Sequence, residues 1–228
     1  MSEFNLESMN EDERFALLVG VMLGDGCLCS YFGNDGTERF AVSITGNYYD
    51  DKPFYNEILT PLLSWAREKP VKIKERPEGG RVDFNFVDKK LFNKIKCSGF
   101  PVGKKGSKLL IPKSFLNKNL MRYIVQGFFS TDGSLVLTDN HGTLYPRVEA
   151  NGISKNLLKE ISDFINSKGI NCKFYKARRK NSYSMGNQQQ YRLQINGRKN
   201  LKKFEKMIGF INPKQIEKLN NYYGCTES

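Results

Sequence analysis

The chain has 228 residues and carries 36 Lys and Arg against 24 Asp and Glu, which gives a formal net charge of +12 at pH 7. A hydrophobic content of 39% supplies enough apolar side chains for a packed core and excludes a disordered chain. The charge excess indicates a polyanionic partner, and the most apolar stretch, Phe15 to Gly24, is too short to cross a membrane. We therefore expect a nucleic-acid-binding protein with no membrane partner.

Few side chains are available for hydrolytic chemistry. The five cysteines lack paired CxxC spacing, which argues against a disulfide framework or a structural zinc site. With His141 as the single histidine, a Ser-His-Asp triad or a histidine-ligated metal has almost no residues to use. Any hydrolysis must then depend on carboxylates. The acidic, polar N-terminal segment has the character of neither a signal nor a transit peptide, so we expect an intracellular protein.

The predicted elements follow an internal repeat. The first helix is predicted to begin at Asn10, which can form a capping box with Glu13, and it runs into "LLVGVMLGDG" (Leu17 to Gly26). The similar "IVQGFFSTDG" (Ile124 to Gly133) follows 107 residues later. After each copy come two alternating stretches, an amphipathic helix, two more alternating stretches and a short helix. The chain is thus predicted to be one α/β unit present twice, with a first half at 1–104, a linker at 105–113 and a second half at 114–228.

The amphipathic helix of the first half contains two prolines. Pro53 suits the first turn of this helix, whereas Pro61 falls in its interior. The sequence therefore predicts a kink near Pro61.

The alternating stretches predict sheets with one apolar and one polar face. Because successive side chains of a strand point to opposite faces, Val42 and Ile44 oppose Ser43 and Thr45, and the same division recurs in the other stretches. A solvated face is the alternative, but the polar residues include little Glu. A β-ribbon that carries Arg, Lys, Asn and Gln suits the major groove of DNA. The candidate DNA-binding residues are Arg39, Ser43, Thr45, Asn47, Lys72, Lys74, Arg76, Arg81, Asp83, Asn85, Arg147, Asn151, Ser154, Lys176, Arg178, Lys180, Gln190, Arg192 and Gln194.

Two small residues four positions apart occur in each motif helix. Gly20 and Gly24 in the first copy match Gly127 and Thr131 in the second, which predicts that the two helices pack closely side by side. Each helix ends at an aspartate, Asp25 or Asp132, where the helix dipole disfavours a carboxylate and a nearby second carboxylate disfavours it further. A divalent cation such as Mg²⁺ resolves both conflicts, and helix-end carbonyls are additional oxygen ligands.

The two motifs resemble those of a known family. The segments "LVGVMLGDG" (Leu18 to Gly26) and "VQGFFSTDG" (Val125 to Gly133) are similar to the paired motifs of single-chain LAGLIDADG homing endonucleases. The segments "TGNYYDDKPFYNEILTPLL" and "GFPVGKKGSKLLIPKSF" also resemble that family. The resemblance implies an α+β fold of two αββαββα halves, whose antiparallel sheets form a DNA-binding saddle with the motif helices paired at a pseudo-twofold axis.

The resemblance also implies a site and a reaction. Asp25 and Asp132 would be the catalytic metal ligands, aided by the main-chain carbonyls of Gly24 and Thr131. Both strands of a long DNA target would be cut across the minor groove. Mg²⁺ or Mn²⁺ would support cleavage, and Ca²⁺ would substitute without supporting it.

Some positions depart from the family pattern. Leu23 and Ser130 replace the first aspartate of each motif, and the polar residue that often follows the second strand corresponds to Gly46 or Asn47 and to Ser154. The family's supporting lysine has no obvious counterpart. The candidates for this catalytic support are Lys89, Asn196 and Arg198.

The sequence thus favours a monomeric, intron-encoded, site-specific DNA endonuclease that depends on Mg²⁺. The alternatives are a splicing cofactor for its own intron RNA, or maturase, and a non-cutting DNA-binding regulator on the same scaffold. Intact aspartates in both motifs argue against a purely binding protein. The residues leave open the target sequence, the cellular compartment, and an intron or intein origin.

Overall fold

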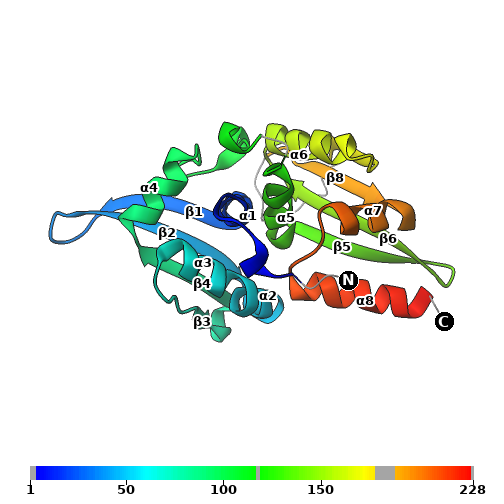
Figure 1. The fold of residues 1–228 in the computed structure, drawn as a ribbon, viewed down its shortest axis with the longest axis horizontal. Helices are drawn as coiled ribbons and strands as arrows, with labels where there is room; N and C mark the ends of the chain where they lie inside the picture. The colour runs from blue at the N-terminus through cyan, green and yellow to red at the C-terminus, as the bar shows by residue number, and fades with distance from the viewer. Residues whose placement is uncertain (1–3, 117–118, 178–187, 227–228) are drawn as a thin grey trace.

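The computed structural model describes residues 4–116, 119–177 and 188–226, which form two halves of the same topology (Figure 1). Each half contains a four-stranded antiparallel sheet, and the strand orders β1-β2-β4-β3 and β5-β6-β8-β7 are equivalent. The predicted α+β architecture of two αββαββα units is therefore confirmed. The strands of the two sheets are β1 (Gly26–Phe32), β2 (Glu38–Asn47), β3 (Lys74–Arg76), β4 (Arg81–Val87), β5 (Gly133–Asn140), β6 (Thr143–Gly152), β7 (Cys172–Lys176) and β8 (Tyr191–Asn196).

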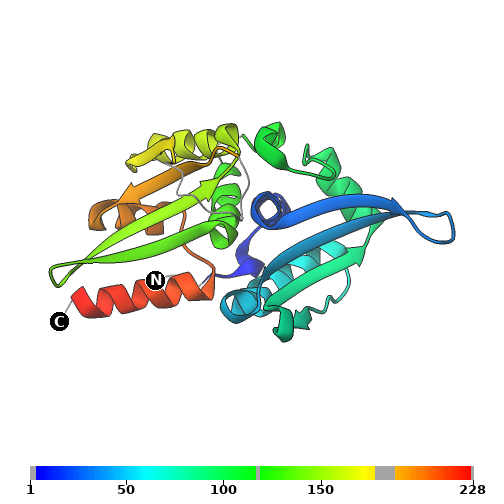
Figure 2. The same cartoon turned by 180° about the vertical axis from the view of Figure 1, so that it is seen from behind.

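Helices complete both halves and lie mainly on one face of each sheet. The helices are α1 (Glu11–Gly24), α2 (Tyr48–Phe54), α3 (Thr60–Arg67), α4 (Lys89–Cys97), α5 (Met121–Thr131), α6 (Lys155–Ser167), α7 (Arg198–Met207) and α8 (Pro213–Thr226). Figure 2 shows the opposite side, where the strands of both sheets lie in front of the helices. None of the helices in the described part of the chain is both long and apolar enough to span a membrane.

The motif helices α1 and α5 lie side by side between the two sheets in both views (Figures 1 and 2). At the start of α1, the predicted capping box is present: the Glu13 amide donates to Asn10 Oδ1 at 3.0 Å and the Asn10 amide donates to Glu13 Oε2 at 2.9 Å. A Cβ atom at Gly20 would collide with the Ile124 carbonyl, and one at Gly127 would collide with the Leu17 carbonyl. The glycines therefore allow the two backbones to touch, as the small-residue spacing predicted.

The proline-containing helix of the first half is irregular where a break was expected. A π-helical turn at Tyr55–Leu59 separates α2 from α3, and Pro61 lies in the first turn of α3. The placement of Pro53 was wrong, because α2 begins at Tyr48, with the Asn47 side chain as its cap, and Pro53 lies inside that helix. The π turn lets the chain pass both prolines without ending the helical segment.

Strand register separates the two faces of each sheet. Val42, Ile44 and Phe84 are fully buried on the helix-covered side of the first sheet, and Leu193 and Ile195 are buried on that side of the second. The side chains between them form the opposite, polar face. This face is the surface that Figure 2 presents in both halves.

Helix α8 has no counterpart among the described residues of the first half. Its first turn bonds to the end of α5, because Gln215 Nε2 donates to the Phe129 carbonyl at 2.8 Å. The helix also contacts β5 and α2, and Lys214 Nζ pairs with the Asp51 carboxylate of α2. The segment before α8 and the helix itself therefore connect the second half to the first.

Candidate active site at the paired helix ends

Asp25 and Asp132 occupy equivalent positions, each as the last residue before the first strand of its sheet. The Asp25 amide donates to the Val21 carbonyl at 3.1 Å, and the Asp132 amide donates to the Phe128 carbonyl at 3.0 Å, so both close the last helical turn. A Cβ atom at Gly24 would overlap the Thr131 side chain and lie 3.4 Å from Asp132 Cγ. The two helix ends are thus in contact, and the two aspartates lie beside one another at the centre of the molecule.

The surroundings of the two carboxylates disfavour their charged forms. Burial, followed by repulsion from Asp132 and Asp51, raises the pKa of Asp25 from 3.8 to about 7. Burial raises the pKa of Asp132 to about 6, although Lys105 acts in the opposite direction. The Asp132 side chain is open to solvent on one side, while protein surrounds it on the others. Positive charge nearby therefore favours the ionised forms of both carboxylates.

Lys105 supplies positive charge to both carboxylates, and Lys214 also acts on Asp25. The Lys105 ammonium group donates to the main-chain carbonyls of Met22 at 3.2 Å, Leu23 at 3.0 Å and Gly24, all at the end of α1. Burial lowers the pKa of Lys105, and the attraction of Asp132 and Asp25 opposes this effect. Lys105 was not among the sequence candidates. The sequence predicts only a linker for 105–113 of the connector that contains it, "GFPVGKKGSKLLIPKSF".

The carbonyls at the end of α5 have different partners. Gln215 Nε2 donates to the Phe129 carbonyl at 2.8 Å and to the Gly133 carbonyl at 2.9 Å, and Asn212 Nδ2 donates to the Ser130 carbonyl at 2.8 Å. These neutral amides are buried. The two helix ends are therefore related by the repeat in their backbones but not in the groups that satisfy their carbonyls.

The donor set at the two helix ends fits a hard divalent cation. It combines two carboxylates of raised pKa with main-chain carbonyls, which are the oxygen ligands that Mg²⁺, Mn²⁺ and Ca²⁺ prefer. Within the described ranges, no cluster of three or more His, Cys, Asp or Glu could hold a metal ion by itself. Zinc, which favours sulfur and imidazole ligands, does not fit this donor set.

Comparisons with known proteins agree with this architecture. Residues 119–209 match the family model of the LAGLIDADG-like domain. The structure of I-DmoI in complex with DNA and Ca superposes with a TM-score of 0.65 at 17% sequence identity, over 93% of this chain and 100% of that chain. The LAGLIDADG meganuclease I-AabMI, bound to uncleaved DNA, gives a TM-score of 0.59 at 15% identity, over 92% of this chain and 89% of that chain. The chain has the fold of the monomeric LAGLIDADG homing endonucleases.

One curated relative is a much longer protein than this chain. The chain is 28% identical over 217 residues to the probable translation initiation factor IF-2 of Methanocaldococcus jannaschii. This alignment takes in 94% of the chain but 16% of the relative.

In this LAGLIDADG fold, most of the candidate DNA-binding residues lie on the polar sheet faces. The register pairs Ser43 with Asn85 and Thr45 with Asp83 in the first half, and Arg147 with Asn196 and Asn151 with Arg192 in the second. Lys74 and Arg76 of β3 lie opposite Asp83 and Arg81 on the same face. Arg39, Arg81, Gln190, Arg192 and Gln194 are partly or fully accessible there.

Carboxylates on these faces hold several of the arginines in place. Asp83 is completely buried beneath Arg81 and Arg76, whose Nε atoms lie 3.2 Å and 3.7 Å from its Oδ2. In the second half, Arg147 Nε lies 2.7 Å from Glu149 Oε2, and Arg192 Nε donates to Asn151 Oδ1 at 2.6 Å. Asp83 was expected to contact DNA itself, but its burial leaves it to position the two arginines.

The structure contradicts the expectations for Ser154 and Lys176, and it gives the exposed Asn47 a capping role. Ser154 is buried, caps α6 and donates to the Leu109 carbonyl at 2.5 Å, so it cannot reach a ligand. Asn47 uses its side-chain oxygen to cap α2. Lys176 lies on the helix side of β7, because Cys172 and Phe174 of the same strand pair with the buried Ile195 and Leu193. The polar face of β7 instead presents Lys173 and Tyr175, which the sequence candidates omitted.

The remaining candidates fall outside the sheets or outside the described residues. Lys72 is exposed and precedes β3. Arg178 and Lys180 lie outside the described residues.

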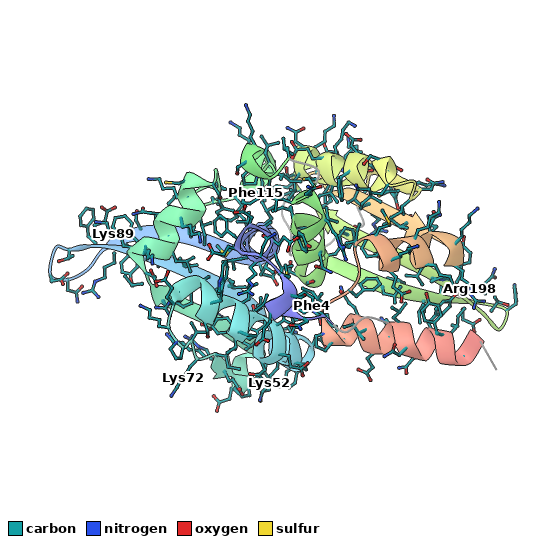
Figure 3. All side chains as sticks on the ribbon, in the orientation of Figure 1. Phe4, Lys52, Lys72, Lys89, Phe115 and Arg198 are labelled. Carbon is teal, nitrogen blue, oxygen red and sulfur yellow. The ribbon has the colours of Figure 1, made fainter. Side chains whose placement is uncertain are left out.

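The predicted catalytic support was also wrong. Figure 3 places Lys89 and Arg198 at the outer parts of the two halves, away from α1 and α5, and the Lys89 ammonium lies 5.4 Å from the Phe40 ring centroid. Gly133, the first residue of β5, pairs with Ala150 of β6. Asn196 of β8 pairs with Arg147, which lies three residues before Ala150 on β6. At about 3.3 Å per residue, Asn196 is therefore about 10 Å along the sheet from the start of β5.

Proposed function

We propose that the protein is a site-specific DNA endonuclease that uses a divalent metal ion to cut both strands of a long target. The observation that supports this proposal best is the pair of aspartates at contacting helix ends, set between two polar sheet faces. A single aspartate-glycine turn would have no functional meaning, but two of them in contact create a carboxylate pair that a cation stabilises.

In this proposal, Asp25 and Asp132 would hold Mg²⁺ or Mn²⁺ together with the carbonyls of Gly24 and Thr131. When bound, such an ion supplies an activated water molecule and neutralises charge on the leaving oxygen of a phosphodiester. The polar sheet faces would orient the duplex, with arginines reading base edges and lysines neutralising phosphates. The net charge of +12 agrees with a nucleic-acid partner.

The test is to incubate the protein with a genomic or randomised DNA library, with Mg²⁺ or with EDTA, and to sequence the cut ends. We expect defined double-strand breaks that require the metal. Asp25→Asn and Asp132→Asn should each reduce cleavage by about 10²-fold or more while leaving DNA binding intact. Asp163→Asn is the matched control, because Asp163 is an exposed aspartate on α6 whose partner is Lys159.

Unchanged cleavage in both active-site variants would refute the proposed site. Enrichment of bound DNA or intron RNA without any cutting would assign the scaffold to regulation or to splicing. Ca²⁺ should permit binding without cleavage.

We further propose that the protein acts as a monomer, with halves at 1–104 and 114–228 and a linker at 105–113. Its match to a segment of a translation initiation factor favours an intein origin over the intron origin that the sequence first suggested.

A further inference from the structure

Lys105 brings a positive charge to the place where the proposed function requires a metal. Its ammonium group lies against three consecutive carbonyls at the end of α1, including that of Gly24. Its main electrostatic partners are the carboxylates of Asp132 and Asp25. An ammonium group that donates to three main-chain carbonyls and is attracted by two nearby carboxylates interacts with the same kinds of oxygen atoms as a bound cation.

The corresponding place in the second half is different. The amides of Gln215 and Asn212 bind the carbonyls of Phe129, Ser130 and Gly133 rather than that of Thr131. Thr131 is the repeat counterpart of Gly24, whose carbonyl accepts from Lys105. A neutral amide also leaves the negative charge of the helix end uncompensated, whereas an ammonium group compensates it.

We propose that Lys105 is a tethered cation that stabilises the carboxylates of Asp25 and Asp132 before metal binds. A divalent ion that binds at the α1 end must displace the Lys105 ammonium group from the carbonyls there. The inference rests on the proposed function for the identity of the metal site. It adds that the two halves take up metal unequally, because Lys105 binds the Gly24 carbonyl at the α1 end, whereas Gln215 and Asn212 bind carbonyls other than that of Thr131 at the α5 end. Lys105 has this role because the connector between the halves brings it to the carbonyls at the end of α1, whereas Asn212 and Gln215 bind carbonyls at the end of α5.

The reach of the lysine makes displacement feasible. Lys105 lies next to the short 3₁₀ turn at Gly106–Lys108, and its long side chain can leave the carbonyls without moving a helix. Lys104, its neighbour in sequence, is exposed. Lys105 contacts the site and Lys104 is its exposed neighbour in the same connector, so substitutions of the two lysines can be compared directly.

The experiment measures Ca²⁺ binding without DNA, by calorimetry and by the thermal unfolding midpoint in EDTA and in excess Ca²⁺. Lys105→Met should lower the midpoint in EDTA and tighten Ca²⁺ binding on the order of tenfold, which corresponds to about 1.4 kcal/mol. Lys104→Met should change neither quantity. Lys105→Arg keeps the charge and should stay closer to the original protein than Lys105→Met in both measurements.

A double variant separates this role from a purely structural one. If Lys105 stabilises the fold by balancing the aspartates, Asp25→Asn should raise the unfolding midpoint of Lys105→Met in EDTA. It should do so even if Lys105→Met alone is largely unfolded. A double variant that is no more stable than Lys105→Met would overturn the proposal.

Two other outcomes are distinguishable. If Asp25→Asn abolishes Ca²⁺ binding but Lys105→Met leaves it unchanged or weaker, the metal site stands and the displacement model is wrong. If Ca²⁺ binding responds to neither variant, the metal site itself is refuted, and the proposed function with it.

Discussion

The ends of α1 and α5 have equivalent backbones, but different side chains donate hydrogen bonds to their carbonyls. Each helix ends at an aspartate followed by a glycine that starts a strand, and the two ends are in contact. Yet the carbonyls at the end of α1 accept from the Lys105 ammonium, whereas those at the end of α5 accept from the buried amides of Asn212 and Gln215. A repeated unit therefore does not produce two equivalent half-sites, because helix-end carbonyls must find donors and each half finds them in segments that the repeat does not include.

The largest effect on stability is expected where the two ends touch. Gly24→Ala should destabilise the protein by roughly 3 kcal/mol, because the new methyl group would overlap the Thr131 side chain. In a Thr131→Gly background the same substitution should cost clearly less, since the overlapping atoms are gone. Chemical denaturation of the four proteins measures this coupling. Gly79→Ala, at a position with open space around it, is the control.

If Gly24→Ala costs the same in both backgrounds, the helix ends are not in direct contact. Both motif helices would then be stabilised separately.

A somewhat smaller effect is expected at the amide cap of α5. Gln215→Leu should cost about 2 kcal/mol, because it removes two hydrogen bonds and leaves the Phe129 and Gly133 carbonyls without these donors. Unlike Lys105→Met, it should leave the Ca²⁺ affinity nearly unchanged, since the amide carries no charge. Denaturation and calorimetry test the two statements. Asn220→Leu, at an exposed position of the same helix, should have little effect on either.

The smallest effect is a difference in pH dependence between the two aspartates. Because their pKa values are raised in the folded protein, the native state binds more protons than the unfolded state, and stability in EDTA should fall as pH rises from about 4 to about 7. Asp25→Asn should remove more of this slope than Asp132→Asn, most clearly between pH 6 and 7. Unfolding free energies measured across this pH range in EDTA test which substitution removes more of the slope. A slope that persists in both variants would show that other groups cause it.

Much of the central site could be predicted because its signals are local and occur twice. The aspartate, the following glycine and the small residues of each helix recur at the same spacing, so the close helix pair follows from either copy. The capping box at Asn10 likewise needs residues only three apart. Such features depend on helix geometry, which short sequence spacing determines.

The errors on the sheet faces have a different cause. Lys176 was grouped with later basic residues, although Cys172 and Phe174 in the same strand carry the apolar alternation that places it on the helix side. That signal was present in the sequence. The burial of Asp83 beneath two arginines was not predictable in this way, since it depends on how β3 and β4 pair.

By itself, the sequence determined the duplicated α+β unit, the pairing of the motif helices and the two aspartates that end them. Tertiary structure alone decided which donors meet the helix-end carbonyls. Lys105 is 81 residues from Gly24, and Gln215 is 86 residues from Phe129. Periodicity identifies the face on which a residue lies, but it carries no information on which distant segment covers that face. The charge balance of the site was therefore settled only when the connector and the segment before α8 packed onto the two helices.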